Sequence, residues 1–121
     1  MQIDLLEQDG ARIAEVRGED KAIKGMPDVL DLIGEIAFNR GISRVLLRRE
    51  LIDESFFDLK SGFAGELAQK FTTYRLKLAV VGDFSWVTSL ALKAYIRESN
   101  LKDTVFFTPR REAALNWLAR G

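Results

Sequence analysis

The alternation of apolar and polar residues at the start of the chain predicts a β-hairpin. Residues Gln2–Leu6 alternate, and so do Ala11–Val16. Between them, Asp9-Gly10 is typical of a tight turn, because glycine readily adopts a positive φ. The chain is therefore expected to open with two antiparallel strands.

Three short apolar runs further along the chain predict buried strands. They are Val45–Leu47, Leu76–Val81 and Thr104–Phe107. The second run is interrupted only by Lys77. A nearly continuous apolar run of this length is typical of a strand that is covered on both faces.

Between the strands, apolar residues recur at the spacing of helices. The four stripes are Val29, Ile33, Ile36 and Ala37; Phe63, Leu67 and Phe71; Val87, Leu90, Ala91, Ala94 and Tyr95; and Ala113, Ala114, Trp117 and Leu118. Pro27 suits a first helical turn, and Gly41 and Asn100 suit helix ends. Thr108-Pro109 predicts the start of the last helix, with a hydroxyl cap followed by proline.

The resulting order of elements is ββαβαβαβα, which predicts an α/β domain. Alternating strands and helices favour parallel strands joined by right-handed crossovers. The opening hairpin adds one antiparallel pair, so the sheet is expected to be mixed. Residues 1–121 have the length of one domain and contain no repeat or linker.

Composition excludes several chemistries. The 18 basic and 18 acidic residues balance, so the excess of positive charge that favours nucleic-acid binding is absent. The chain has no cysteine and no histidine, which excludes disulfides, thiolate nucleophiles and histidine-based catalysis or zinc binding. We expect no cofactor and no metal, and a catalytic function would depend on carboxylates such as Asp58 or Asp83.

The first residues, Met1-Gln2-Ile3-Asp4, lack the basic start and apolar segment of a secretory signal. No apolar stretch approaches the roughly 20 residues that a membrane span requires. The sequence therefore predicts a soluble cytoplasmic protein that binds no membrane.

The most plausible site for a ligand is the edge of the sheet where the parallel strands end. The segments that reach this edge contribute Arg48, Arg49, Ser55, Asp83, Ser85, Thr88, Arg110 and Arg111. Helix N-termini at this edge would favour an anion. The alternative is that the hydroxyl and carboxylate side chains only cap helices and that the arginines are solvated.

Ser55 has two interpretations. As a phosphoacceptor, it would add negative charge near Glu54 and Asp58 and also near Arg48 and Arg49. As a structural residue, it would be a helix N-cap, with Asp58 at the third position of a capping box.

Three aromatic residues near this edge are candidates for an interaction surface. Adjacent residues on a helix point in different directions, so one of Phe56 and Phe57 is expected in the core and the other at the surface. Trp86 follows a Gly-Asp turn, where it would cover a pocket or an interface, or pack on the rim of the core.

Four longer stretches carry a resemblance to known families. The stretch Tyr74–Trp86 and the ending Val105–Leu118 are similar to SpoIIAA-like proteins, relatives of the STAS domain. The stretches Phe56–Tyr74, with its FFDL, AGE and QKF motifs, and Val81–Asn100, with its VGDFS motif, resemble a bacterial family of unknown function more closely.

The SpoIIAA-like resemblance implies cytoplasmic, non-enzymatic relatives. In their anti-sigma-factor antagonists, a serine of a D-S-S-G motif is phosphorylated by a partner kinase. The corresponding residues here are Asp53-Glu54-Ser55-Phe56, so Asp53 and Ser55 match while Glu54 and Phe56 depart from the motif. The resemblance makes Ser55 the candidate phosphoacceptor.

Two functional hypotheses follow. The first is a non-catalytic interaction module, a homodimer that docks a protein partner around Ser55–Asp58 and Trp86. The second is a sensor of a small anionic or apolar metabolite bound at the carboxyl ends of the parallel strands, near Arg48 and Arg49.

Overall fold

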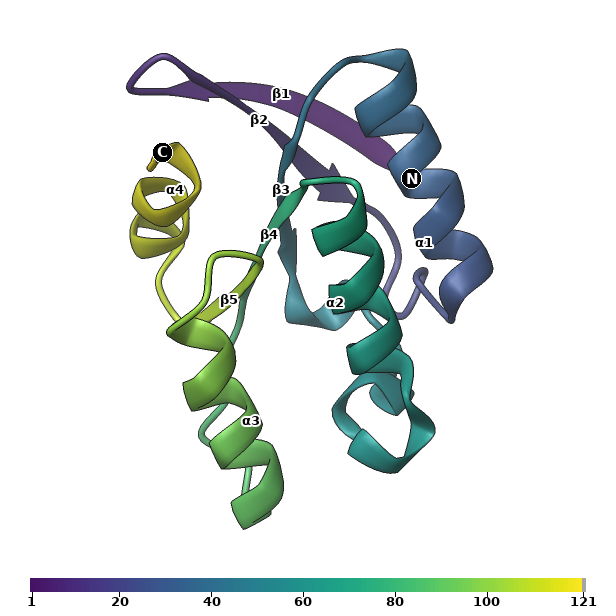
Figure 1. Ribbon diagram of the computed structural model, residues 1–121, viewed down its shortest axis with the longest axis vertical. Coiled ribbons are helices and arrows are strands. Elements are labelled where there is room, and N and C mark those ends of the chain that lie inside the picture. Colours follow the sequence, from purple (N-terminus) through teal and green to yellow (C-terminus); the bar gives the residue numbers. More distant parts are fainter. Residues whose placement is uncertain (121) are drawn as a thin grey trace.

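A computed structural model describes residues 1–120 of the chain (Figure 1). Five strands and four α-helices follow one another along the chain in this order: β1 (Gln2–Gln8), β2 (Ala11–Arg17), α1 (Met26–Ile33), β3 (Arg44–Arg48), α2 (Phe63–Thr73), β4 (Lys77–Val81), α3 (Leu90–Asn100), β5 (Val105–Thr108) and α4 (Arg111–Ala119). Three short 3-10 turns, Arg49–Leu51, Glu54–Phe57 and Leu59–Ser61, lie between β3 and α2.

The five strands form one mixed sheet in the order β1-β2-β3-β4-β5. β1 and β2 pair antiparallel around the Asp9-Gly10 turn, with Ile3 opposite Val16 and Leu6 opposite Ile13. Strands β2 to β5 are all parallel. The predicted α/β class and mixed sheet are therefore confirmed.

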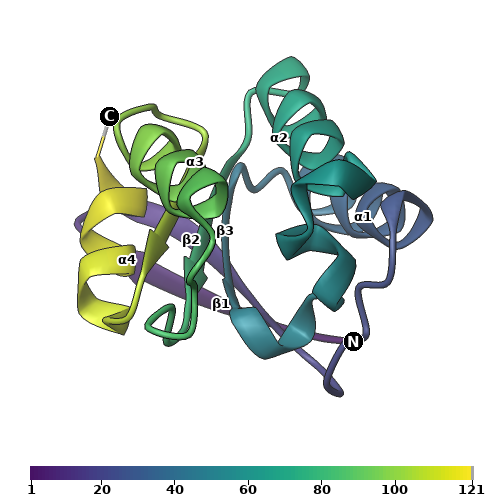
Figure 2. The same ribbon diagram turned by 90° about the horizontal axis from the view of Figure 1, so that it is seen from below.

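The helices cover both faces of this sheet. Figure 2 shows α1, α2 and α3 following one another along the sheet. Under them lies the larger core cluster, which includes Ala14, Val45 and Leu47. The intervening residue of β3, Leu46, points to the opposite face and packs with Trp117 and Leu118 of α4. Alternate residues of the central strands thus enter two cores, which explains their nearly continuous apolar runs.

The first helix continues through a π-helical turn. α1 ends at Ile33, and residues Gly34–Asn39 extend it with wider hydrogen bonding. The chain then reverses at Gly41, which has a φ of 66°, a left-handed conformation that glycine adopts without strain. The predicted end of the helix at Gly41 is confirmed.

Two predicted helix starts are placed too early. α3 begins at Leu90 rather than near Val87, and its N-cap is Ser89, whose hydroxyl accepts a hydrogen bond from the Leu92 N–H at 3.2 Å. Thr108 belongs to β5, and its hydroxyl accepts from the Arg110 N–H at 3.2 Å instead of capping α4. Hydroxyl residues stabilise turns as well as helix starts, so the sequence pattern alone fits either.

The outer edge of β5 is closed by side chains from the end of α3. Asn100 donates to the Phe107 carbonyl at 2.9 Å and accepts from the Phe107 N–H at 2.8 Å. The Ser99 hydroxyl donates to the Val105 carbonyl at 2.7 Å. Backbone groups that would otherwise be free at a sheet edge are thereby satisfied within the domain.

Candidate functional site

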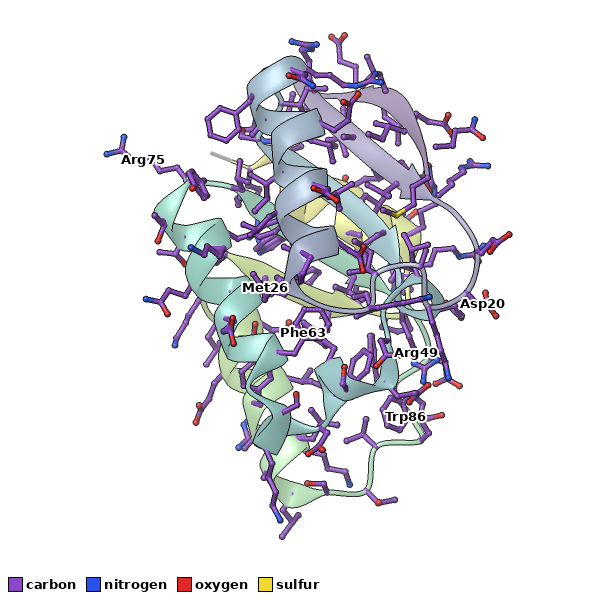
Figure 3. The ribbon with its side chains drawn as sticks, turned by 90° about the vertical axis from the view of Figure 1, so that its right-hand side faces the viewer. Asp20, Met26, Arg49, Phe63, Arg75 and Trp86 are labelled. Carbon is purple, nitrogen blue, oxygen red and sulfur yellow. The ribbon has the colours of Figure 1, made fainter. Side chains whose placement is uncertain are left out.

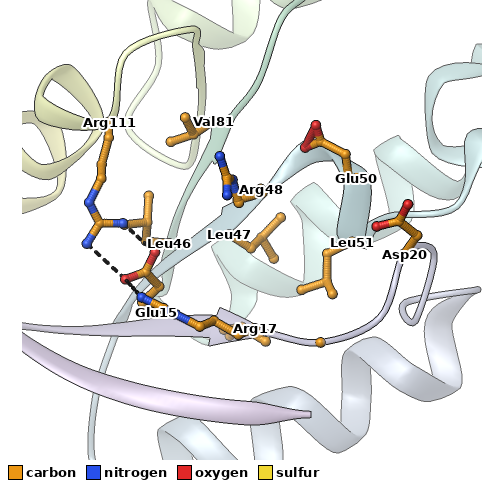
Figure 4. A pocket seen from close by; sticks show the side chains of 12 residues that line it. Glu15, Arg17, Asp20, Leu46, Leu47, Arg48, Glu50, Leu51, Val81 and Arg111 are labelled. Atoms are coloured by element: carbon orange, nitrogen blue, oxygen red, sulfur yellow. Dashed lines mark hydrogen bonds and ion pairs between the residues drawn. The ribbon is translucent and has the colours of Figure 1, made fainter.

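A cavity of about 780 Å³ lies at the carboxyl ends of β2, β3 and β4, on the face of the sheet that α4 covers (Figure 4). α4 packs over the middle of this face, on Ile13, Leu46 and Ala79, and the strand ends beyond it stay open. The lining residues are Glu15, Val16, Arg17, Gly18, Asp20, Leu46, Leu47, Arg48, Glu50, Leu51, Val81 and Arg111. We call this cavity the strand-end pocket.

One wall of the strand-end pocket is an ion pair between β2 and α4. Both guanidinium NH groups of Arg111, the first residue of α4, donate to the two carboxylate oxygens of Glu15, one of them at 2.9 Å. Glu15 is only 5% exposed, although its side chain is a carboxylate. The pair holds the start of α4 against the sheet, because a bidentate contact fixes both the orientation and the distance of the two side chains.

The ion pair keeps both groups charged. Hydrogen bonding to Arg111 lowers the pKa of Glu15, against the opposing effect of its burial. The same hydrogen bond raises the pKa of Arg111. At neutral pH the wall therefore presents one positive and one negative charge that already satisfy each other.

The other two arginines of the pocket differ in their partners. Arg17 binds Asp4 at 2.9 Å and approaches Glu15 at 3.7 Å. Arg48 is the last residue of β3, is exposed, and points into the pocket (Figure 4). Within residues 1–120 it has no carboxylate within 4.0 Å, so it is the pocket cation that is free to bind an anion.

Arg49, the neighbour of Arg48, does not line the pocket. Its guanidinium carbon lies 4.8 Å from the centre of the Trp86 ring and 5.6 Å from that of Phe57, and Figure 3 shows Arg49 beside Trp86. Its side-chain stem packs against Gly82, where an added Cβ would lie 2.6 Å from the Cβ of Arg49. Arg49 therefore joins the turn after β3 to the loop after β4 through cation–π contacts.

Phe56 and Phe57 are both core residues, and the prediction that one of them is exposed is wrong. They are 1% and 9% exposed. Phe56 contacts Phe63 and Phe107 edge-on or tilted, and Phe57 contacts Phe84 and Trp86. They lie in a tight 3-10 turn beneath several helices and loops, where both rings are covered.

Ser55 is not an N-cap, so that prediction is wrong too. Asp53 caps the 3-10 turn, and its carboxylate accepts from the Ser55 N–H at 3.1 Å, which lowers the pKa of Asp53. The Ser55 carbonyl accepts from the Ser61 hydroxyl at 2.5 Å. Asp58 caps the next 3-10 turn by accepting from the Lys60 N–H at 3.2 Å.

Asp83, Ser85 and Trp86 form one turn after β4. The Asp83 carboxylate accepts from the Ser85 N–H at 2.9 Å, and this bond lowers the pKa of Asp83. The Trp86 indole donates to the Asp83 carbonyl at 2.7 Å. Trp86 remains 40% exposed, so it is the one aromatic of the predicted docking surface that stays open to solvent.

The structure thus divides the predicted site into two places. Arg48 lines the strand-end pocket, while Arg49 and Trp86 meet around the aromatic cluster. The sequence reasoning did not single out Glu15, Arg17, Asp20 and Glu50 of the pocket. The one available signal was Glu15, a carboxylate between apolar Ala14 and Val16 in a strand.

Two kinds of feature are absent from the part of the chain that the structure describes. Residues 1–120 contain no group of three or more His, Cys, Asp or Glu side chains arranged to hold a metal ion. Among the same residues, no helix is both long and apolar enough to cross a bilayer.

The fold and the pocket together define a class of protein, an α/β domain with a charged cavity at the ends of its parallel strands. The model of a family described as a domain of unknown function, DUF4180, matches residues 8–118. The chain belongs to this family. Comparisons with curated proteins and with solved structures gave no match.

Proposed function

We propose that this domain binds a small molecule carrying an anionic group in the strand-end pocket. The observation that supports the proposal is Arg48, a cation without a protein partner within residues 1–120, which points into a cavity of about 780 Å³. Cavities of roughly 300–1,000 Å³ are typical of sites for small ligands. The carboxyl edge of parallel strands is also where α/β sheets commonly bind them.

Within residues 1–120, Arg48 is the pocket arginine that is left free to bind an anionic group. The pocket's other arginines, Arg17 and Arg111, are occupied by Asp4 and Glu15. A carboxylate or phosphate that reaches Arg48 would therefore form a new charge-assisted hydrogen bond without breaking an existing one. The neighbouring Glu15–Arg111 pair holds the wall in place, so little ordering would accompany binding.

The interaction module has weaker support. Its predicted docking surface depended on an exposed phenylalanine, and Phe56 and Phe57 are both buried. Trp86 is left as the exposed aromatic of that surface. A homodimer and a cytoplasmic location remain proposals from the sequence, and a SpoIIAA-like switch at Ser55 remains a proposal from the resemblance.

A thermal-shift assay with a panel of small anions tests the proposal. Inorganic phosphate, citrate, short-chain carboxylates and nucleoside monophosphates would be added to the wild type, to Arg48→Ala and to Arg12→Ala. Arg12 is exposed on β2 and lies outside the pocket, so it is the matched control. A ligand at 100 times its dissociation constant stabilises the fold by about 2.7 kcal/mol.

We expect at least one anion to raise the melting temperature of the wild type and of Arg12→Ala but not of Arg48→Ala. A stabilising anion that acts equally on Arg48→Ala would place the site elsewhere. Native mass spectrometry of the purified protein would then show whether a bound molecule is present at all.

A further inference from the structure

The strand-end pocket also carries negative charge on the side opposite the Glu15–Arg111 wall. Asp20, in the loop after β2, and Glu50, in the turn after β3, line this side, and Figure 4 shows them beyond Arg48 as seen from Arg111. Both are exposed, and within residues 1–120 neither has a Lys or Arg nitrogen within 4.0 Å.

The fold holds the backbone segments that carry these two carboxylates side by side. The loop and the turn that carry them are joined by backbone hydrogen bonds, from Lys21 N–H to the Glu50 carbonyl at 2.7 Å and from Ile23 N–H to the Leu51 carbonyl at 2.9 Å. Lys21 itself has a φ of 59°, an uncommon conformation for a residue with a side chain. The position of Asp20 is therefore held by a specific, tightly bonded turn.

The unpaired charges of the pocket suit a ligand that carries both charges better than a simple anion. When the Arg17–Asp4 and Arg111–Glu15 pairs are set aside, Arg48 provides one positive charge, and Asp20 and Glu50 provide two negative charges. A ligand that is only anionic would gain from Arg48 and be repelled by the carboxylates. A ligand with a cationic group at its far end would satisfy both sides.

We propose that the ligand of the strand-end pocket is zwitterionic, with an anionic group at Arg48, an ammonium or guanidinium group at Asp20 and Glu50, and an apolar chain between them. This inference rests on the proposed function and specifies its ligand class. Leu47 and Leu51 line the pocket between these charged groups, and although their side chains are only 2% and 4% exposed, they make this part of the lining apolar (Figure 4). Amino acids with the two groups at opposite ends of a chain have this chemistry.

A matched set of probes tests the charge pattern directly. In 6-aminohexanoate both charges are present, in hexanoate only the anion, and in hexylamine only the cation. Each would be titrated into ¹⁵N-labelled protein, with the amide signals of Gly18, Arg48 and Leu51 as reporters. The variants are Asp20→Asn/Glu50→Gln, Arg48→Ala, and the control Asp31→Asn/Glu66→Gln, whose two carboxylates are exposed outside the pocket.

We expect wild type and control to bind 6-aminohexanoate roughly tenfold more tightly than hexanoate, because of the added charge-assisted hydrogen bond. The advantage should disappear in Asp20→Asn/Glu50→Gln, while hexanoate binds that variant no worse. Equal affinities for the two probes in wild type, or an advantage that survives in Asp20→Asn/Glu50→Gln, would overturn the zwitterion inference alone. No response of the pocket amides to any probe, or a response to hexanoate that persists in Arg48→Ala, would overturn the proposed function as well.

Discussion

Replacing Arg111 by methionine removes the main partner of a buried carboxylate while keeping most of the side chain's volume. In Arg111→Met, Glu15 would stay in β2, where it is 5% exposed, with Arg17 as its remaining cation at 3.7 Å. Glu15→Gln removes the other half of the pair, and it leaves a guanidinium whose side chain is 48% exposed. The two variants therefore break the same contact but leave very different groups behind.

The two variants should lose unequal amounts of folding stability. Removing one partner of a fully buried pair costs about 3–5 kcal/mol, because the remaining charge is buried without compensation. Since Arg17 stays close to Glu15, we expect a loss of about 2–3 kcal/mol for Arg111→Met. Glu15→Gln should cost about 1 kcal/mol, because water can solvate the half-exposed Arg111 and the new amide can still accept a hydrogen bond.

The loss in Arg111→Met should depend on pH. Hydrogen bonding to Arg111 lowers the pKa of Glu15 in the folded state below its ordinary value of 4.5. A lowered folded-state pKa contributes stability that is present above the unfolded value and is lost as the pH falls through the folded value. Without Arg111 this contribution is absent, so the difference between wild type and variant should narrow as the pH falls below 4.5.

Urea unfolding, followed by circular dichroism at pH 7, 5 and 3.5, measures both effects. The control is Arg110→Met, next in the chain, which within residues 1–120 pairs with the exposed Glu112 alone. We expect it to cost less than about 0.5 kcal/mol, as is typical of surface pairs. Equal losses for Arg111→Met and Glu15→Gln, or a loss in Arg111→Met that is the same at pH 7 and pH 3.5, would refute the reasoning.

Three further predictions concern the core, the edge of the sheet and the contact between Arg49 and Trp86. Phe56→Ala should cost about 3–5 kcal/mol in urea unfolding, because Phe56 is 1% exposed, whereas Phe38→Ala, at a residue 69% exposed, should cost far less. Asn100→Ala should cost about 1–3 kcal/mol through its two lost hydrogen bonds to Phe107. Asn39→Ala should cost almost nothing, because the exposed Asn39 side chain donates to the half-buried Glu35 at the surface of the same helix. Arg49→Gln should cost about 1 kcal/mol and change the fluorescence of Trp86, since it removes the cation over that ring; an unchanged spectrum would contradict the contact.

The architecture was predictable because a strand that is buried on both faces of the sheet has apolar residues at successive positions of the sequence. Val45-Leu46-Leu47 is apolar at every position since Leu46 enters the core under α4 while its neighbours enter the core under the other helices. The hairpin was equally readable from Asp9-Gly10, both of which have a positive φ in the structure. In each case the physical requirement falls on residues that are adjacent in the sequence.

The helix starts were harder to predict because capping chemistry is not specific to helices. Thr108 and Asp83 both accept a hydrogen bond from the N–H two residues later, which closes a turn rather than a first helical turn. The residue that does cap α3, Ser89, has the same side-chain chemistry as Ser85. Which of them begins the helix depends on where Trp86 and Val87 pack, and this is decided by residues far away in the sequence.

The strand-end pocket could not be predicted from local sequence patterns either, because its charged residues come from segments that are far apart in the sequence. Glu15 is 96 residues from Arg111, so a polar residue in an ordinary-looking strand becomes a buried ion pair only when α4 folds back over the sheet. Arg48 and Arg49 are adjacent and chemically identical, yet one points into the cavity and the other stacks on Trp86, because Arg48 ends strand β3 whereas Arg49 begins the 3-10 turn that follows it. The net charge of the whole chain is zero, which does not show how the charges of the pocket are paired. Within residues 1–120 some of them form ion pairs, whereas Arg48 and the carboxylates facing it do not. The unpaired charges determine what the pocket can bind, and three-dimensional pairing alone reveals which ones they are.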